Sequence, residues 1–156
     1  MDLTADDLAG VVDLFGGLTR SELSRACSEL AFKRGGEVDS VEDAIDDAVE
    51  SYRLLSIPAS ERNGDDPLLV VGPTAFPALP EDAEDLPHIM DVDQRDVDAD
   101  VVATVAEERF AADAEAALGE GNRDRIEQLL DVSYELDVWG PVDVDATRAR
   151  LVDAVE

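Results

Sequence analysis

Apolar residues recur at helical spacing in three stretches between residues 4 and 52. Thr4 with Asp7 and Thr19 with Glu22 have the spacing of capping boxes, so they open the first two helices. Each of these helices ends at a pair of glycines, and the third begins at residues 39–40. The side chains expected to face the core are Leu8, Val11, Val12 and Phe15, then Leu23, Cys27, Leu30 and Ala31, then Val41, Ile45, Ala48, Val49 and Tyr52.

The pattern then changes to two short apolar runs with strand character, residues 52–57 and 68–71. Asn63-Gly64 between them is a strong turn signal, although the loop is longer than a tight hairpin. We therefore predict an antiparallel pair with a loose loop. Three helices followed by a hairpin resemble a winged helix.

Residues 73–97 contain four prolines, a density that argues against helix and central strand. They also contain apolar residues that a free linker would not need. We expect an ordered connector whose apolar side chains insert into grooves of the helical body. These side chains are Phe76, Leu79, Leu86, Ile89 and Met90.

Residues 98–156 return to helical spacing. Asp98 is expected to cap a long helix that ends near Leu118, Asn122 opens the next, and Asp143 or Asp145 caps a final short one. The expected inward residues are Val101, Val102, Val105, Ala106 and Phe110, then Ile126, Leu129, Leu130 and Ser133, then Leu151 and Val155. The fold class is thus mainly α with a small antiparallel β-hairpin. A winged-helix-like half (1–72), a connector (73–97) and a helical half (98–156) would form one cooperative unit.

Charge changes this picture most. Asp and Glu number 39 against 12 Lys and Arg, the net charge is −27, and Lys33 is the sole lysine. The acids run along the whole chain among apolar residues, whereas an acidic tail would be a contiguous block. Molar salt shortens the Debye length to roughly 3 Å and screens such repulsion. We interpret the acidity as adaptation to very salty solvent, with an acidic nucleic-acid mimic as the rival interpretation.

Candidate chemistry is sparse. Residues 91–100 are rich in aspartate but lack the glycine and terminal glutamate that an EF-hand loop requires. His88 and Cys27 are the only residues of their kinds, and transition-metal sites normally need several. No phosphate-binding glycine motif is present. We therefore expect no catalytic, cofactor-binding or metal-binding residues, with Cys27 buried and His88 in a structural hydrogen bond.

The scarce cations are more informative. Arg20, Arg25, Lys33 and Arg34 make residues 19–34 the one clearly positive segment. They either pair with acids of the third helix or form a contact site for an acidic partner or nucleic acid. The third helix, 39–50, carries no cation, which disfavours DNA because phosphate contacts dominate DNA affinity.

Several segments together resemble the small, acidic, functionally uncharacterised protein families confined to haloarchaea. They are residues 18–25 (LTRSELSR), 31–35 (AFKRG), 72–77 (GPTAFP) and 84–88 (EDLPH). The resemblance extends over nearly the full chain. It implies a source and a compartment but no activity.

These observations favour a non-enzymatic cytoplasmic interaction or regulatory protein adapted to high salt, with a protein partner. The alternative is a winged-helix DNA-binding transcriptional regulator, and an enzyme ranks third. The start of the chain lacks the basic and apolar regions of a signal peptide, and no apolar run is long enough to span a membrane. A membrane partner is therefore not expected.

Overall fold

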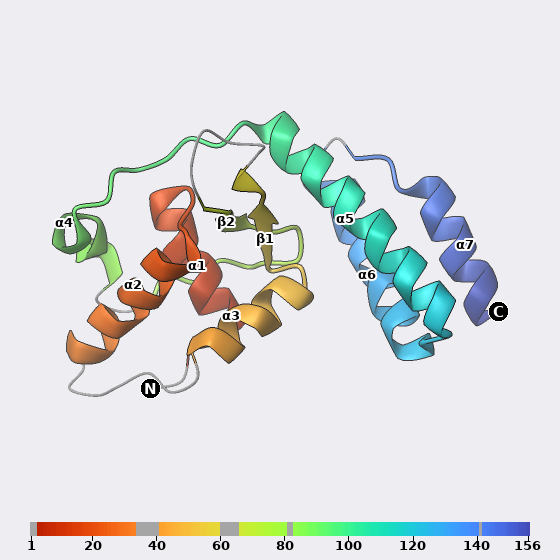
Figure 1. Cartoon of the computed structure of the whole chain (residues 1–156), viewed down its shortest axis with the longest axis horizontal. Coiled ribbons are helices and arrows are strands. Elements are labelled where there is room, and N and C mark those ends of the chain that lie inside the picture. The colour runs from red at the N-terminus through yellow and green to blue at the C-terminus, as the bar shows by residue number, and fades with distance from the viewer. Residues whose placement is uncertain (1–2, 34–40, 60–65, 81–82, 141) are drawn as a thin grey trace. The chain divides into compact units, whose positions relative to one another are not determined.

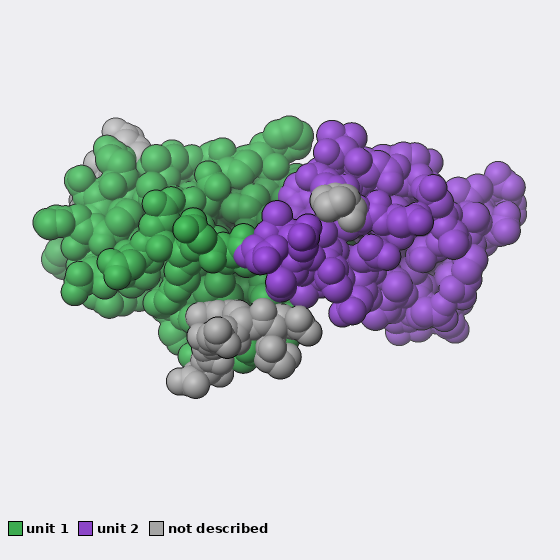
Figure 2. Space-filling view, turned by 90° about the horizontal axis from the view of Figure 1, so that it is seen from above, with its two compact units in different colours: residues 1–97 green, residues 98–156 purple. Residues whose placement is uncertain are grey.

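The computed structural model describes residues 3–33, 41–59, 66–80, 83–140 and 142–156. The chain divides into two compact units, residues 1–97 and residues 98–156, coloured green and purple in Figure 2. This division is based on contacts within the chain and does not decide whether the two units unfold together, so cooperative unfolding stays a prediction.

Three helices form the first part of unit 1: α1 (Ala5–Phe15), α2 (Arg20–Lys33) and α3 (Val41–Glu50). Both expected capping boxes are present. The Thr4 hydroxyl accepts from Asp7 N–H at 3.0 Å, and the Glu22 carboxylate accepts from Thr19 N–H at 2.9 Å. The glycines expected to end α2 and the expected cap of α3 lie outside the described residues.

The hairpin follows α3. Strands β1 (Leu54–Ile57) and β2 (Leu68–Val71) pair antiparallel, with Leu54 opposite Val71. Leu18, between α1 and α2, pairs with Leu69 of β2 through N–H···O bonds of 3.0 and 2.7 Å. Helices α1, α2 and α3 are followed by the hairpin of β1 and β2 (Figure 1). With the bridge at Leu18, this is the order of elements expected from the resemblance to a winged helix. The expected Asn63-Gly64 turn lies outside the described residues.

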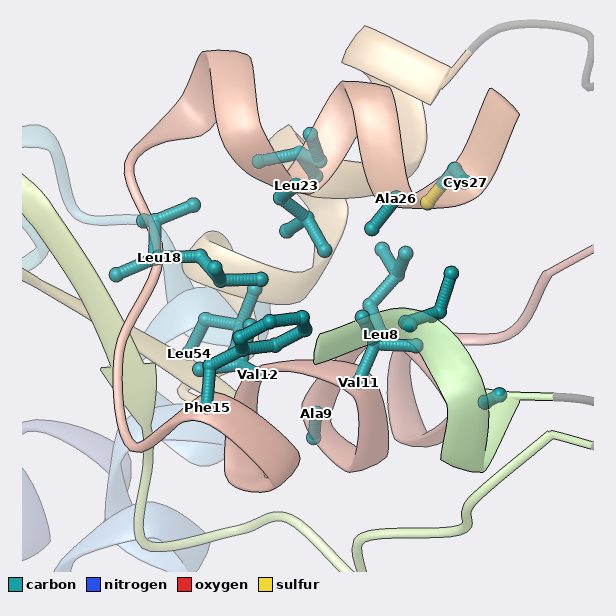
Figure 3. Close-up of a cluster of buried hydrophobic side chains, with 14 of the residues drawn as sticks. Leu8, Ala9, Val11, Val12, Phe15, Leu18, Leu23, Ala26, Cys27 and Leu54 are labelled. Atoms are coloured by element: carbon teal, nitrogen blue, oxygen red, sulfur yellow. The ribbon is translucent and has the colours of Figure 1, made fainter. Parts of the chain in front are cut away.

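The core of unit 1 is built from the apolar faces that helical spacing predicts. Figure 3 shows Phe15 of α1 among side chains of α2 and the hairpin. The fully buried members include Leu8, Val11, Val12, Phe15, Leu23, Cys27, Leu30, Ile45, Ala48 and Leu54. Tyr52 is also fully buried, just after α3, where its backbone φ is 64°.

The connector contains helical structure, so the expectation that its prolines exclude helix was wrong. A 3₁₀ turn, η2 (Ala83–Asp85), leads into the short helix α4 (Leu86–Met90). Pro87 lies in the first turn of α4, where a proline has no helical hydrogen bond to lose. Leu86 and Met90 are buried, as expected.

Three other expected anchors of the connector are not buried. Phe76 is 76% exposed, Leu79 50% and Ile89 38%. Around Phe76 and Leu79 it is the backbone that attaches this segment to α1, so their side chains are free to face outward. The sequence pattern identified the apolar residues but not which side of the backbone they occupy.

Unit 2 consists of α5 (Ala99–Glu120), α6 (Arg123–Trp139) and α7 (Asp145–Val155). Asp98 and Asn122 cap α5 and α6 as expected. Helix α5 runs past Leu118 and ends at Gly121, whose φ is 64°. Val144 occupies the N-cap of α7 without a side-chain bond, although Asp143 accepts from Asp145 N–H at 3.2 Å.

The core of unit 2 combines small and large side chains. Its buried members are Ala103, Val105, Ala106, Phe110, Ala114, Ala117, Ile126, Leu129, Val132, Leu136, Val144 and Leu151. Val101 and Val102, expected to point inward, are only half-buried. Among the described residues no helix is long and apolar enough to cross a membrane.

Candidate interaction surface

Arg20, at the first position of α2, is bound to α3. Its Nε donates to a Glu42 carboxylate oxygen at 2.5 Å, and its Nη2 donates to Glu42 carbonyl oxygen at 3.1 Å and to Asp46. The hydrogen bond from Arg20 lowers the pKa of Glu42, and Ser24 donates a second bond to the same carboxylate. The charge of Arg20 is therefore already matched by acids of the third helix.

The other predicted contact cations divide into two groups. Arg25 is exposed on α2 and makes no ion pair with any residue that the structure describes. The side chain of Lys33 and the whole of Arg34 lie outside the described residues.

Helix α3 presents an acidic outer face. Its inner face contributes Ile45 and Ala48 to the core. The exposed residues on the other side are Glu42, Asp43, Asp46, Asp47 and Glu50, and the helix contains no cation. In a winged helix this is the helix that enters the DNA major groove, so here that position carries negative charge.

Arg95 fixes the end of the connector to the turn between α1 and α2. Its guanidinium donates to both Glu22 carboxylate oxygens, at 2.6 and 3.0 Å, and to Gly17 carbonyl oxygen at 3.0 Å. Its own N–H donates to Phe15 carbonyl oxygen at 2.7 Å. The hydrogen bonds from the Arg95 guanidinium, with those from Thr19, lower the pKa of Glu22 despite its partial burial.

The role of Arg95 was missed in the sequence. One signal was available: Arg95 is the single cation among the acids of residues 91–100. The sequence does not show which distant acid it meets, because Glu22 lies far away along the chain.

Residues 76–79 form a contiguous exposed apolar segment, Phe-Pro-Ala-Leu, beside α1. Asp6 of α1 binds the backbone of this segment. Its carboxylate accepts from Phe76 N–H at 3.2 Å, and its carbonyl oxygen accepts from Ala78 N–H at 3.0 Å. A Cβ added to Gly10 of α1 would lie 2.1 Å from Ala78 carbonyl oxygen, so the two backbones are in close contact. Phe76 and Leu79 were expected to insert into grooves of the helical body, whereas both side chains are exposed.

The described residues offer little for catalysis. Cys27 is buried, and burial raises the pKa of its thiol to about 12, which keeps it protonated near neutral pH. His88 is exposed on α4. No cluster of three or more potential metal ligands occurs in the described parts of the chain. A hollow of about 240 Å³ lies between the start of α2 and the hairpin, with Arg20 and Asp66 on its wall.

The model of a family of unknown function, DUF7109, matches residues 6–156. The chain belongs to the DUF7109 family. The match includes nearly all of unit 1 and the whole of unit 2, so DUF7109 comprises both. No curated protein and no solved structure matches the chain. The resemblance to an uncharacterised family therefore holds.

Proposed function

We propose that this DUF7109 member is a non-enzymatic interaction or regulatory protein of a cytoplasm rich in salt, and that it binds another protein rather than DNA. The observation that carries the proposal is the acidic outer face of α3. A DNA-reading helix approaches phosphates closely, and lysine and arginine contacts supply most of the affinity. Carboxylates in that position repel the duplex.

The pairing of Arg20 supports the same conclusion. Contact with phosphate would require this side chain to leave Glu42 and Asp46, both of which would then face the duplex unpaired. The net charge of −27 adds a long-range repulsion that only high salt reduces. High salt also weakens phosphate contacts, so the conditions that permit approach do not favour binding.

DNA binding is tested by selecting duplexes from a random-sequence pool with the full chain and comparing the selected and unselected sequences by fluorescence anisotropy, from dilute to molar potassium chloride. We expect no sequence-selective binding at any salt concentration at which the protein is folded. Tight, selective binding that Arg20→Ala and Arg25→Ala abolish would contradict the proposal.

Protein binding is tested by purifying the tagged full chain from its native cells in high salt, with and without nuclease. We expect the same protein to co-purify in both samples, and the reciprocal purification to return this chain. Loss of the co-purifying protein after nuclease treatment would show that nucleic acid joins the two.

A DNA-binding regulator is the second candidate. The pairing of Leu18 with Leu69 favours it, because that bridge completes the element order of a winged helix. A fold does not transfer its usual function when the contacting residues differ. An enzyme ranks third, since the thiol of Cys27 is buried with a raised pKa and the described residues hold no cluster of three or more potential metal ligands.

A further inference from the structure

We propose that residues 76–79 are a preorganised binding element, which inserts Phe76 and Leu79 into an apolar pocket with a basic rim on a partner protein. The proposal rests on the interaction role proposed above and assigns it to a surface. Phe76 and Leu79 are two exposed large apolar side chains close together in the chain, at 76% and 50%. Pro77 and Ala78 between them are exposed too.

The backbone of this segment is held at several points. Thr74 donates to Ser51 carbonyl oxygen at 2.8 Å from its hydroxyl and to Tyr52 carbonyl oxygen at 3.2 Å from its N–H. Phe76 and Ala78 both donate to Asp6, at 3.2 and 3.0 Å. Binding therefore does not have to order the backbone, which removes much of the usual entropic cost.

The exposure of these side chains costs solubility unless a partner covers them. A phenylalanine or leucine that leaves water contributes roughly 1.5–3 kcal/mol. In this segment four successive exposed residues carry no charge, within a chain of net charge −27. Such a break in a charged surface is typical of a contact site.

The hydrogen bonds also restrict the mode of binding. An added β-strand would pair with alternate backbone N–H groups. Those of Phe76 and Ala78 already donate to Asp6, and Pro77 has none. Recognition must therefore take place through the side chains, which fits a pocket and not a sheet edge.

Charge complementarity selects the partner. The carboxylate of Asp6 lies beside Phe76, and Glu84 and Asp85 are exposed further along the connector. Arg53, 3.5 Å from Asp6, is the one cation that an ion pair places next to the segment in the described structure. Salt screens charges in direct contact, partly shielded from solvent, much less than separated ones. A pocket rimmed by lysine or arginine would therefore still be attracted, whereas a second copy of a chain with a net charge of −27 would bring mainly further carboxylates to the contact.

The experiment uses the full chain carrying the photo-crosslinking residue p-benzoylphenylalanine at position 76, expressed in native cells at high salt. Matched control chains carry it at position 32 or 138, where Phe32 and Val138 are 81% and 88% exposed. The protein captured from position 76 is identified, purified and titrated against the full chain and its variants. We expect Phe76→Ser and Leu79→Ser each to weaken its binding about tenfold or more, and Phe32→Ser to leave it unchanged.

The crosslinked peptide of the partner should be apolar and flanked by lysine or arginine. Capture of a second copy, equal capture from positions 32 and 76, or binding unaffected by both serine substitutions would each overturn the assignment. A partner captured only from position 32 or 138 would contradict the assignment of the contact to residues 76–79, but it would remain consistent with the proposed interaction role. Capture from none of the three positions would contradict both.

Discussion

Within unit 1, Gly10 and Arg95 each attach the connector to α1 or to the turn that follows it, without using a large apolar side chain. Gly10 lets the backbone at Ala78 approach α1 directly, and Arg95 binds the Glu22 carboxylate and the turn at Gly17. The missing side chain of Gly10 lets the connector backbone pack against α1, and the side chain of Arg95 fixes the end of the connector. These two positions are therefore the sharpest tests of the packed connector.

Gly10→Ala should destabilise the protein. The new Cβ would lie 2.1 Å from Ala78 carbonyl oxygen, and overpacking of this kind costs about 1–3 kcal/mol, more than the gain in helix propensity. Urea unfolding in molar potassium chloride measures the change. Gly119→Ala is the matched control in α5, because nothing lies within 4 Å of its added Cβ. It should stabilise by up to about 1 kcal/mol, and equal effects of the two substitutions would refute the close contact.

Glu22→Gln should remove the charge that Arg95 binds while keeping an oxygen for the capping bond from Thr19 N–H. At neutral pH we expect a loss of about 1–2 kcal/mol. Because folding lowers the pKa of Glu22, its contribution is present above the ordinary carboxyl range and disappears as pH falls through the folded pKa. The difference between wild type and variant should thus shrink on acidification.

Glu107→Gln, at an exposed position of α5, is the control for the general effect of removing one negative charge. It should leave neutral-pH stability unchanged or raise it slightly, since it reduces repulsion. A Glu22→Gln variant that behaved like Glu107→Gln at every pH would show that the contact with Arg95 contributes nothing.

At the scale of the elements, the scarce arginines connect one helix with another. Arg20 joins α2 to α3, Arg125 joins α6 to Asp113 of α5, and Arg150 joins α7 to Glu115 of α5. Each arginine of unit 2 forms an ion pair with an acid of that unit. Several of the arginines that the structure describes are thus used to hold helices together.

Arg148 has the least exposed side chain of the arginines in unit 2, at 17%. It donates to the buried Ser133 hydroxyl and carbonyl oxygen, both at 2.8 Å, and to Asp137 at 2.5 Å. Its guanidinium also lies 4.6 Å from the centre of the Tyr134 ring. These bonds attach α7 to α6.

Arg148→Ala should therefore destabilise unit 2 by about 2–3 kcal/mol, because several charged hydrogen bonds are lost and Ser133 is left short of a partner. Thermal unfolding followed by the fluorescence of Trp139, the sole tryptophan, reports on unit 2. Arg150→Ala on the same helix removes an exposed pair and should change the midpoint little. Equal shifts for the two variants would contradict the attachment of α7 through Arg148.

At the scale of the whole molecule, the dominant quantity is the net charge of −27. We expect helix content, measured by circular dichroism, to rise between dilute buffer and molar potassium chloride as screening removes repulsion. Mild acidification should partly replace salt, because protonated carboxylates no longer repel. Full stability in dilute buffer at neutral pH would contradict the interpretation of the acidity as salt adaptation.

Cooperative unfolding of the whole chain stays a prediction. Unit 2 is small, and domains of its size are marginal when they fold alone. We expect the transition seen by Trp139 fluorescence to coincide with that seen by circular dichroism, which reports on both units. Two separate transitions, or rapid proteolysis between residues 91 and 98 that leaves two stable pieces, would show independent folding.

Much of the secondary structure could be predicted from the sequence, because it depends on interactions between residues close together in the chain. Thr4, Thr19, Asp98 and Asn122 cap helices through bonds that reach only two or three residues ahead, so spacing alone reveals them. Apolar residues three and four apart necessarily share one helix face, which is why Leu23 and Cys27 are buried as expected. The hairpin follows from two apolar runs separated by turn residues.

Only the tertiary structure determined which residues form the candidate surface. Arg95 meets Glu22, and Asp6 meets Phe76, across separations of 73 and 70 residues, and no local rule links such positions. Phenylalanine usually lies in a core, yet the side chain of Phe76 is exposed while its N–H donates to Asp6. Local periodicity therefore determined the elements and their inner faces. The orientation of the irregular connector, and with it the exposed 76–79 segment, depended on hydrogen bonds and close contacts between residues far apart in the chain.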